Sequence, residues 1–221
     1  MKLAGWLWVV ASVSFSAGCR AEPGAAATPA PEPVPAATPA PAPQAATTAS
    51  PDVAPASTSV AVLAGGCFWG MEELLRKLPG VLNTSVGYTG GTSKNPVYED
   101  VHTGTTNHAE SVRVEFDPSV LPYERLLAYF FSIHDPTTKN RQGNDIGTQY
   151  RSAIFVLDAA QRQTAEAVIA RVTASGDWKA PLTTQVIDAT EFYPAEAYHQ
   201  DYLQKNPGGY TCHYPRTVSF Y

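Results

Sequence analysis

The chain has 221 residues, and its 15 Lys and Arg against 20 Asp and Glu give a formal net charge of −5. No basic run interleaved with aromatic residues occurs, which argues against a nucleic-acid-binding protein. The 5 histidines show no pairing with cysteine at the spacing of zinc sites, so we expect neither a metal nor another cofactor.

The first 18 residues have the pattern of an export signal. Lys2 precedes an apolar run over residues 3–10, and small residues at 16–18 lead into Cys19. The run is shorter than the about 20 apolar residues that a membrane span needs. The site resembles the processing site of bacterial lipoproteins, although Ser16 stands where a leucine is usual. We expect lipid attachment at Cys19 rather than ordinary cleavage, with the protein exported to the periplasmic side and held at a membrane by this lipid alone.

Residues 19–57 form a second region of unusual composition, because from residue 21 onward they are almost all Ala, Pro and Thr. The region holds no aromatic residue and too few large apolar ones to offset the entropy lost on ordering. Its prolines favour extended, polyproline-like conformers, so we expect a disordered, semi-rigid spacer. Residues 58–221 remain, and their number is that of one domain with a substantial core.

The hydrophobic pattern of this domain predicts strand, helix, two strands, helix, strand, helix, strand and helix. The predicted strands cover residues 60–64, 81–88, 111–116, 152–157 and 183–187, and the predicted helices cover residues 68–78, 122–134, 158–174 and 194–205. Asp158 and Gln161 form a capping-box-like start for the third helix. This order predicts an α+β fold: a two-layer sandwich with a mainly antiparallel sheet, a ferredoxin-like βαββαβ core and extended loops.

The segment Gly-Gly-Cys-Phe-Trp-Gly at residues 65–70 places Cys67 between the first strand and the first helix. Free N–H groups and the helix dipole at a helix N-terminus favour thiolate over thiol. The glycines let a substrate approach the sulfur closely, and the two aromatics can wall an apolar pocket. We interpret Cys67 as a reactive cysteine. Cys212 is the second cysteine of the domain, and the count fits either a resolving partner or a structural disulfide.

Four loop segments carry more polar and aromatic residues than a connection needs, and single residues in them also have ordinary explanations. Tyr98 and Tyr150 fit core aromatics with a satisfied hydroxyl. Glu110 fits a solvated charge at a strand end, and Asp145 fits a turn residue among Gly and Asn.

Together, the segments resemble peptide methionine sulfoxide reductase A. The matching motifs are Gly-Gly-Cys-Phe-Trp-Gly at 65–70, Gly-Tyr-Thr-Gly-Gly at 87–91, His-Ala-Glu at 108–110 and Arg-Gln-Gly-Asn-Asp-Ile-Gly-Thr-Gln-Tyr-Arg-Ser at 141–152. The resemblance covers residues 60 to about 214 and leaves out the leader and the spacer. It implies thiol-dependent reduction of methionine-S-sulfoxide, free or in proteins, as repair of oxidative damage. The export signal would place this repair outside the cytosol.

The resemblance also implies a role for each cysteine. Cys67 would attack the sulfoxide sulfur, while Phe68 and Trp69 would hold the S-methyl group. The resulting sulfenic acid would condense with Cys212 to a disulfide, and the glycines at 208–209 would make the tail mobile enough to bring this cysteine in. Thioredoxin or a thioredoxin-like reductant would then recycle the disulfide of a monomeric enzyme.

The same resemblance places the polar residues around the sulfoxide oxygen. Glu110 would protonate this oxygen, Tyr98 and Tyr150 would donate hydrogen bonds to it, and Asp145 would support the network. An ordinary glutamate is ionised at neutral pH. We therefore expect Glu110 to be buried, with a pKa raised chiefly by desolvation.

Two other functions fit some of the same residues. Cys67 could be the nucleophile of a hydrolase or acyltransferase with His108 or His199 as base, but the aromatic pair and the lack of an evident oxyanion loop argue against it. The domain could also be a lipid-anchored binding module stapled by a Cys67–Cys212 disulfide, which would resist mild reduction.

Overall fold

A computed structural model of the chain describes residues 57–221, which belong to one compact unit. The predicted export signal, Cys19 and nearly all of the predicted spacer lie outside the described residues. Among the described residues, no helix has both the length and the apolar character needed to span a membrane.

The elements follow the predicted order, with several short additions in the loops. The strands are β1 (Ser59–Gly65), β2 (Val81–Thr89), β3 (Ala109–Phe116), β4 (Arg141–Gln142), β5 (Asp145–Ile146), β6 (Ser152–Val156), β7 (Gln185–Asp188) and β8 (Tyr193–Pro194). The helices are α1 (Phe68–Leu75), α2 (Tyr98–His102), α3 (Tyr123–Ile133), α4 (Ala159–Ser175) and α5 (Tyr202–Lys205), and Thr148–Tyr150 forms the 3-10 turn η1.

Six strands form one sheet in the order β7-β6-β1-β3-β2-β8, while β4 and β5 form a separate hairpin. Strand β1 lies antiparallel to both β3 and β6, and β2 lies antiparallel to β3. The order β6-β1-β3-β2 is that of a ferredoxin-like βαββαβ core. The parallel pair β6–β7 and the short strand β8 extend it at the two edges. The predicted α+β class is therefore confirmed.

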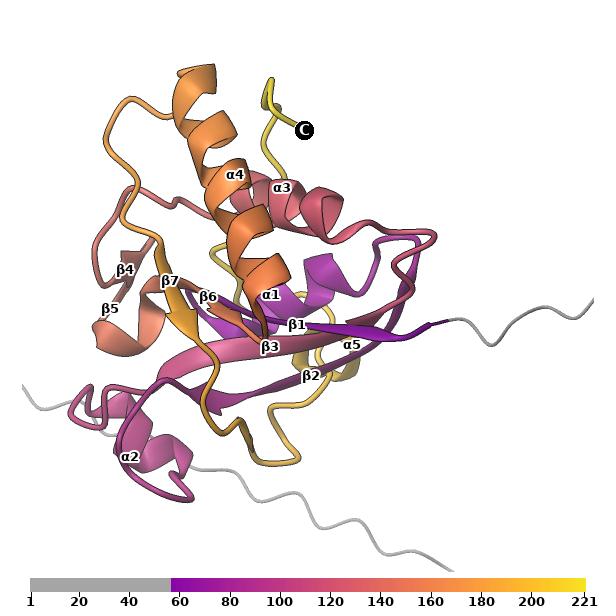
Figure 1. The fold of residues 1–221 in the computed structure, drawn as a ribbon. Helices are drawn as coiled ribbons and strands as arrows, with labels where there is room; N and C mark the ends of the chain where they lie inside the picture. The colour runs from indigo at the N-terminus through magenta and orange to yellow at the C-terminus, as the bar shows by residue number, and fades with distance from the viewer. Residues whose placement is uncertain (1–56) are drawn as a thin grey trace, which may run out of the picture. The chain divides into compact units, whose positions relative to one another are not determined.

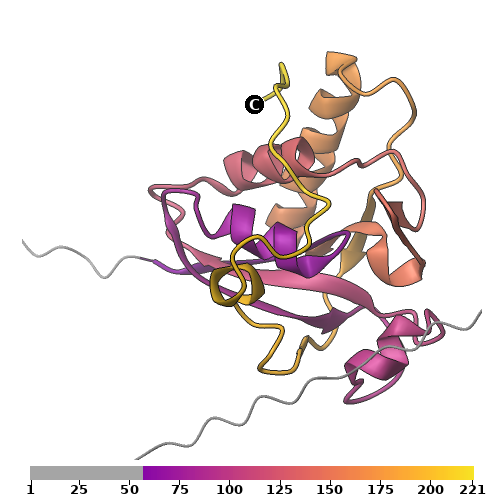
Figure 2. The same ribbon diagram turned by 180° about the vertical axis from the view of Figure 1, so that it is seen from behind.

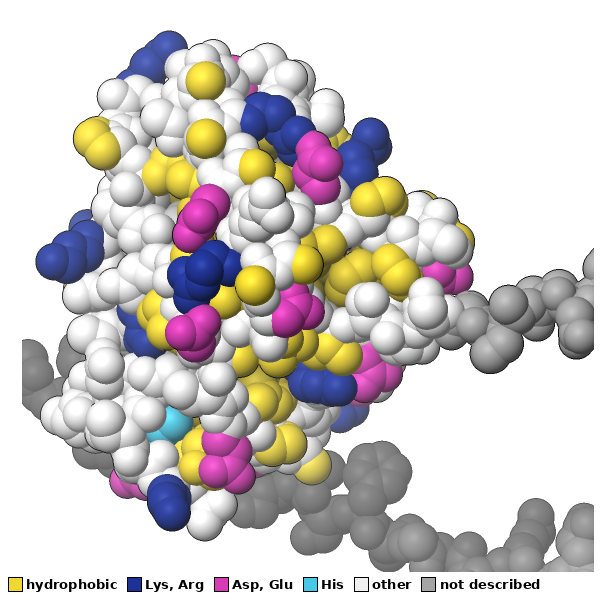
Figure 3. All heavy atoms as spheres, viewed as in Figure 1, with side chains coloured by type: hydrophobic (Ala, Val, Ile, Leu, Met, Phe, Trp, Pro, Cys, Tyr) yellow, Lys and Arg dark blue, Asp and Glu magenta, His cyan; other side chains and the backbone are white. Residues whose placement is uncertain are grey.

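Helices α1, α3 and α4 cover one face of the sheet (Figures 1 and 2). The core lies between them and alternate strand residues such as Leu63 and Val112, which are fully buried with Phe130 of α3. The residues between these, including Val62 and Phe155, pack in a second, smaller cluster on the other face. On the side shown in Figure 3, Lys and Arg side chains are scattered among Asp and Glu rather than gathered in one patch.

The third predicted helix is α4, and it begins where the sequence predicts. The Asp158 side chain accepts a hydrogen bond from the Gln161 N–H at 2.7 Å, which satisfies one of the free N–H groups of the first turn. The first helix is shorter than predicted, because α1 ends at Leu75 and not at residue 78.

The predicted helix over residues 194–205 is wrong for most of its length. Pro194 belongs to β8, and only Tyr202–Lys205 are helical. The Gln200 side chain accepts a hydrogen bond from Val86 N–H and donates one to Val86 C=O, each at 2.9 Å. This amide completes the edge of β2 as a strand would. Asp201 then turns the backbone with a φ of 55°, which a right-handed helix does not allow.

Candidate active site

The predicted site residues converge on one cavity of about 230 Å³ that opens at the start of α1. Its lining residues are Cys67, Phe68, Trp69, Tyr98, His102, Glu110, Asp145, Tyr150 and Tyr210. They come from α1, α2, β3, β5, η1 and the C-terminal tail, so segments far apart in the sequence form one site.

Cys67 precedes the first residue of α1 and is 7 % exposed. The Trp69 N–H faces its sulfur and lowers the thiol pKa, as expected at a helix N-terminus. Burial, with a further contribution from the negative charge of Glu110, raises the Cys67 pKa by more, to well above its ordinary value. The prediction that the helix end favours thiolate is therefore outweighed in the resting site, where Cys67 is a protonated thiol.

Glu110 lies on β3 and is 3 % exposed. Its Oε2 accepts a hydrogen bond from the Phe68 N–H at 3.1 Å, which joins the carboxyl to the residue directly after Cys67. Burial raises the Glu110 pKa to about 8, against the smaller opposite effect of the Phe68 N–H. The carboxyl is thus largely protonated at neutral pH. Its burial and raised pKa are those that the sequence analysis expects of a proton donor.

The two tyrosines reach the cavity from separate elements. Tyr98 begins α2, where its N–H donates to Glu196 Oε1 at 2.8 Å and its hydroxyl lies 3.4 Å from His102 Nδ1. Tyr150 ends η1. Burial and the charge of Glu110 raise the pKa of both hydroxyls, so both stay protonated and can donate hydrogen bonds.

Aromatic side chains hold the apolar side of the cavity in place. The Trp69 ring stacks on Tyr202, with centroids 3.7 Å apart and planes 12° from parallel. The Trp69 Nε1–H donates to His199 Nδ1 at 3.0 Å, and the His199 ring also lies 5.1 Å from the ring of Phe68. A thioether methyl fits such a wall of aromatic carbon.

The two histidines considered as bases for a hydrolase have other partners. His199 Nδ1 is occupied by Trp69, and burial lowers the His199 pKa. His108 Nδ1 accepts from the Gly91 N–H at 3.2 Å, and its Nε2 lies 2.8 Å from Ser93 O. Neither ring is free to take a proton from Cys67, which argues against the Cys-His hydrolase.

Asp145 connects the cavity to the C-terminal tail. Its Oδ1 accepts from the Tyr210 hydroxyl at 3.0 Å, and its Oδ2 accepts from Cys212 Sγ at 3.3 Å. Cys67 and Cys212 are both free thiols. The Cys67 N–H faces the Cys212 sulfur, so the tail already lies at the site and does not need to travel there.

Sequence reasoning did not select His102 or Tyr210 as site residues. His102 lies one helical turn after Tyr98, but a five-residue helix has too short a pattern to predict this. Tyr210 lies two residues before Cys212, and this proximity is the one signal that could have pointed to it.

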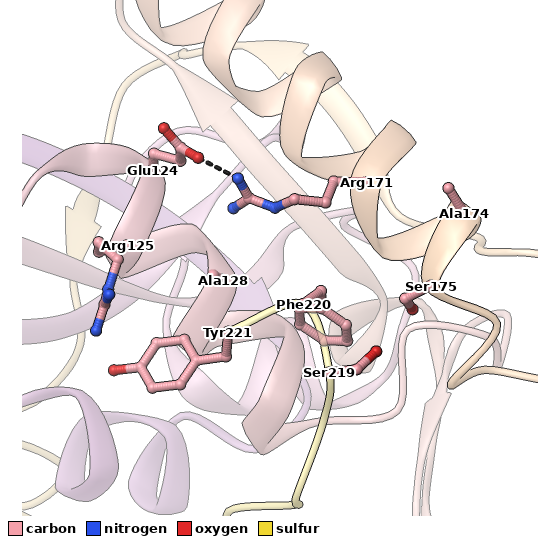
Figure 4. Close-up of a pocket in the computed structure, with 9 residues that line it drawn as sticks. All are labelled: Glu124, Arg125, Ala128, Arg171, Ala174, Ser175, Ser219, Phe220 and Tyr221. Atoms are coloured by element: carbon pink, nitrogen blue, oxygen red, sulfur yellow. Dashed lines mark hydrogen bonds and ion pairs between the residues drawn. The ribbon is translucent and has the colours of Figure 1, made fainter.

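A larger cavity of about 550 Å³ lies elsewhere, between α3, α4 and the C-terminal residues (Figure 4). Glu124 and Arg171 form an ion pair on one side of it, and Phe220 and Tyr221 lie on the other (Figure 4). Neither a cysteine nor a histidine lines this cavity, so its size alone gives it no catalytic chemistry.

Comparison with known proteins supports the resemblance to peptide methionine sulfoxide reductase A that the sequence motifs indicate. A family profile described as peptide methionine sulfoxide reductase matches residues 59–220. The peptide methionine sulfoxide reductase MsrA of Nocardia farcinica is 59% identical over 159 residues, which is 72% of this chain and 91% of the relative. MsrA 2 of Rhodopirellula baltica is 55% identical over 159 residues, 72% of this chain and 92% of the relative.

Solved structures agree with these relatives. Reduced Mxr1 from Saccharomyces cerevisiae superposes with a TM-score of 0.69 at 38% identity, covering 74% of this chain and 95% of Mxr1. Methionine sulfoxide reductase A of Corynebacterium diphtheriae superposes with a TM-score of 0.63 at 40% identity, covering 72% of this chain and 79% of that structure. With the cavity described above, these matches show that the chain belongs to the peptide methionine sulfoxide reductase family, among its MsrA-type enzymes.

Proposed function

We propose that the domain reduces methionine-S-sulfoxide, free or in proteins, to methionine, with Cys67 as nucleophile and Glu110 as proton donor. The observation that carries this proposal is the buried Glu110 carboxyl, hydrogen-bonded at 3.1 Å to the residue that follows Cys67 in the same cavity, where burial raises its pKa to about 8. Each of the two reductase classes acts on one sulfoxide epimer, and the S epimer is assigned from the similarity to the MsrA class.

The first step transfers oxygen from the substrate to Cys67. As the Cys67 sulfur attacks the sulfoxide sulfur, negative charge develops on the sulfoxide oxygen, where Tyr98 and Tyr150 donate hydrogen bonds and Glu110 donates a proton. The thiol proton of Cys67 then returns to Glu110. The substrate S–O bond and the new S–S bond then break as the hydroxyl passes to the Cys67 sulfur, which gives methionine and a Cys67 sulfenic acid with no net gain or loss of protons.

The second step regenerates the site. The Cys212 thiol attacks the sulfenic sulfur of Cys67, an S–S bond forms, and the hydroxyl leaves with the Cys212 proton as water. A thioredoxin-like protein then reduces the disulfide by thiol–disulfide exchange. Mxr1 has been solved in complex with Trx2, a structure with a TM-score of 0.50 and 26% identity to this chain, and this supports such a partner.

We further propose that this chemistry takes place outside the cytosol, on a domain tethered through lipid at Cys19. The support is the leader sequence and the Ala/Pro/Thr-rich segment that separates it from the domain. Mass spectrometry of the membrane fraction should find an N-terminal peptide that begins with a diacylglyceryl-modified Cys19. An unmodified N-terminus beyond Cys19 would contradict the tether without affecting the proposed chemistry.

The reductase activity is tested by anaerobic single turnover of the reduced domain with each epimer of methionine sulfoxide. We expect one methionine per enzyme from the S epimer only, with two thiols lost in the wild type and one in Cys212→Ser. If neither epimer gives methionine while Cys67 remains intact, the proposed function is wrong.

A further inference from the structure

Two glycines of the cysteine motif, Gly66 and Gly70, leave room for side chains of the C-terminal tail. A Cβ atom added to Gly70 would lie 2.1 Å from Thr211 Oγ1 and 2.8 Å from His213 Nδ1. A Cβ atom added to Gly66, whose φ is +111°, would lie 2.5 Å from Gln142 Cγ and 3.1 Å from His213 Nε2. These glycines therefore create a slot, the space over Gly66 and Gly70 that the side chains of Gln142, Thr211 and His213 fill.

His213 is the most deeply buried tail residue in this slot, at 5 % exposure. Its Nε2 lies 2.8 Å from the carbonyl oxygen of Gly65. Because a carbonyl oxygen only accepts hydrogen bonds, the Nε2 nitrogen carries a proton. Burial also lowers the His213 pKa, to about 4, which keeps the ring neutral at physiological pH.

The hydrogen bond joins the two redox segments. Gly65 ends β1 two residues before Cys67, and His213 directly follows Cys212. On the other side of Cys212, Tyr210 is held by Asp145. The resolving cysteine is thus fixed from both sides while its own side chain is half-buried.

We propose that His213 is a positioning residue for the resolving step, a latch whose hydrogen bond to Gly65 holds the tail in the glycine slot and Cys212 beside Cys67. This inference rests on the proposed function. In the step concerned, the Cys212 S–H and Cys67 S–O bonds break, the S–S bond forms, and hydroxyl and proton leave as water, so no further oxidant or reductant is needed.

The geometry favours a latch over a base. The His213 Nδ1 lies 3.5 Å from Cys212 Sγ, whereas the Asp145 Oδ2 is closer, at 3.3 Å. Burial and Asp145 raise the Cys212 pKa to about 12, so a buried imidazole with a pKa of about 4 accepts this proton poorly. The contribution of His213 therefore comes from its Nε2–H, on the side away from the sulfur.

The test separates the two steps in anaerobic single turnover with methionine-S-sulfoxide. Methionine formation reports the first step. Disulfide formation, followed by thiol counting and by dimedone trapping of the sulfenic acid, reports the second. In His213→Ala, methionine should form at the wild-type rate, while the disulfide should form more slowly, by up to about tenfold. This is the effect expected from the loss of one buried hydrogen bond.

Two further variants identify the atom responsible. His213→Gln keeps an N–H that can reach Gly65 O, so disulfide formation should recover; equal slowing in Gln and Ala would overturn the latch. Ser219→Ala is the matched control, because it loses the hydroxyl hydrogen bond, 2.9 Å long, that anchors the tail to Asp177, but it lies beyond the slot. It should resolve at the wild-type rate.

The slot can also be filled from the other side, which covers the case in which His213→Ala fails to fold. Gly70→Ala adds a methyl group where Thr211 and His213 lie, while alanine is the better helix former by about 1 kcal/mol. We expect normal methionine formation and a trapped sulfenic acid. A disulfide formed at the wild-type rate in either His213→Ala or Gly70→Ala would overturn the proposal, whereas loss of methionine in the wild type would instead overturn the proposed function.

Discussion

Substitution of Glu110 by glutamine should separate catalysis from stability. Glutamine keeps an oxygen that can accept from the Phe68 N–H, and it keeps the size of the side chain, but it cannot deliver a proton. Removal of a general acid slows a reaction by about 10²–10⁴-fold. We expect Glu110→Gln to slow methionine formation in the first turnover by a factor in this range.

The same substitution should make the domain more stable at neutral and alkaline pH. The Glu110 pKa is about 8 in the folded domain against an ordinary value of 4.5. Between these values the unfolded chain has released its proton while the folded chain still holds it, so the free energy of unfolding falls as pH rises through this window. At about 1.4 kcal/mol per pH unit, and with half of the folded chains ionised at pH 8, the loss reaches roughly 3 kcal/mol at pH 7 and roughly 4 kcal/mol at pH 8.

Urea denaturation of the wild type and Glu110→Gln from pH 5 to pH 9 measures this difference. The wild type should lose stability relative to the variant up to about pH 8 and remain parallel to it above. Glu115→Gln is the matched control on the same strand. Arg113 lowers the pKa of Glu115, so this control should not become more stable than the wild type as pH rises.

Either of two results would refute the reasoning. Equal pH dependence in the wild type and Glu110→Gln would mean that Glu110 is ionised in the folded domain. A native rate of methionine formation in Glu110→Gln would mean that another group donates the proton. The wild-type rate should also fall above about pH 8, as Glu110 ionises.

Three further substitutions, one of them with a control, test other parts of the structure. Asp158→Ala removes the N-cap of α4 and should lower the free energy of unfolding by about 1 kcal/mol in urea, with unchanged single-turnover rates. Tyr202→Leu removes the ring stacked on Trp69 and should lower kcat/KM for methionine-S-sulfoxide by up to about tenfold. Tyr98→Phe removes one hydrogen-bond donor to the sulfoxide oxygen and should slow methionine formation by about 10²-fold, whereas Tyr123→Phe, which removes a buried hydroxyl without a partner, should leave that rate unchanged.

The sequence predicts those elements whose cause is local. The apolar residues of β1, the period-two alternation of β3 and the Asp158 cap each act within a few residues of chain, and all three elements are present. The segment before α5 was mispredicted for a non-local reason. Its backbone is set by the bonds of Gln200 to Val86, a residue 114 positions away. No pattern within the segment carries that information.

The site shows the same division. Motifs predict which residues share the cavity, because each motif fixes residue type and spacing around one reacting atom. They do not predict the direction of the Cys67 pKa, because the helix N-terminus lowers it locally while burial by distant segments raises it more. The glycines of the cysteine motif predict space for substrate, but Gly66 and Gly70 make space for Gln142 and for a tail that lies more than 140 residues further along the chain.

A buried, protonated Cys67 also explains how the site can be both reactive and selective. A thiol reacts with oxidants and electrophiles mainly as thiolate, so the raised pKa protects the resting cysteine from reagents that do not fit the cavity. In the proposed mechanism, a sulfoxide bound between Glu110 and the two tyrosine hydroxyls changes this balance, because its oxygen takes the Glu110 proton and leaves a carboxylate that can accept the thiol proton. The Trp69 N–H then stabilises the sulfur as it becomes anionic. The nucleophile is thus generated by the oxygen atom that it removes, and the burial that opposes thiolate in the empty cavity confines its formation to the substrate complex.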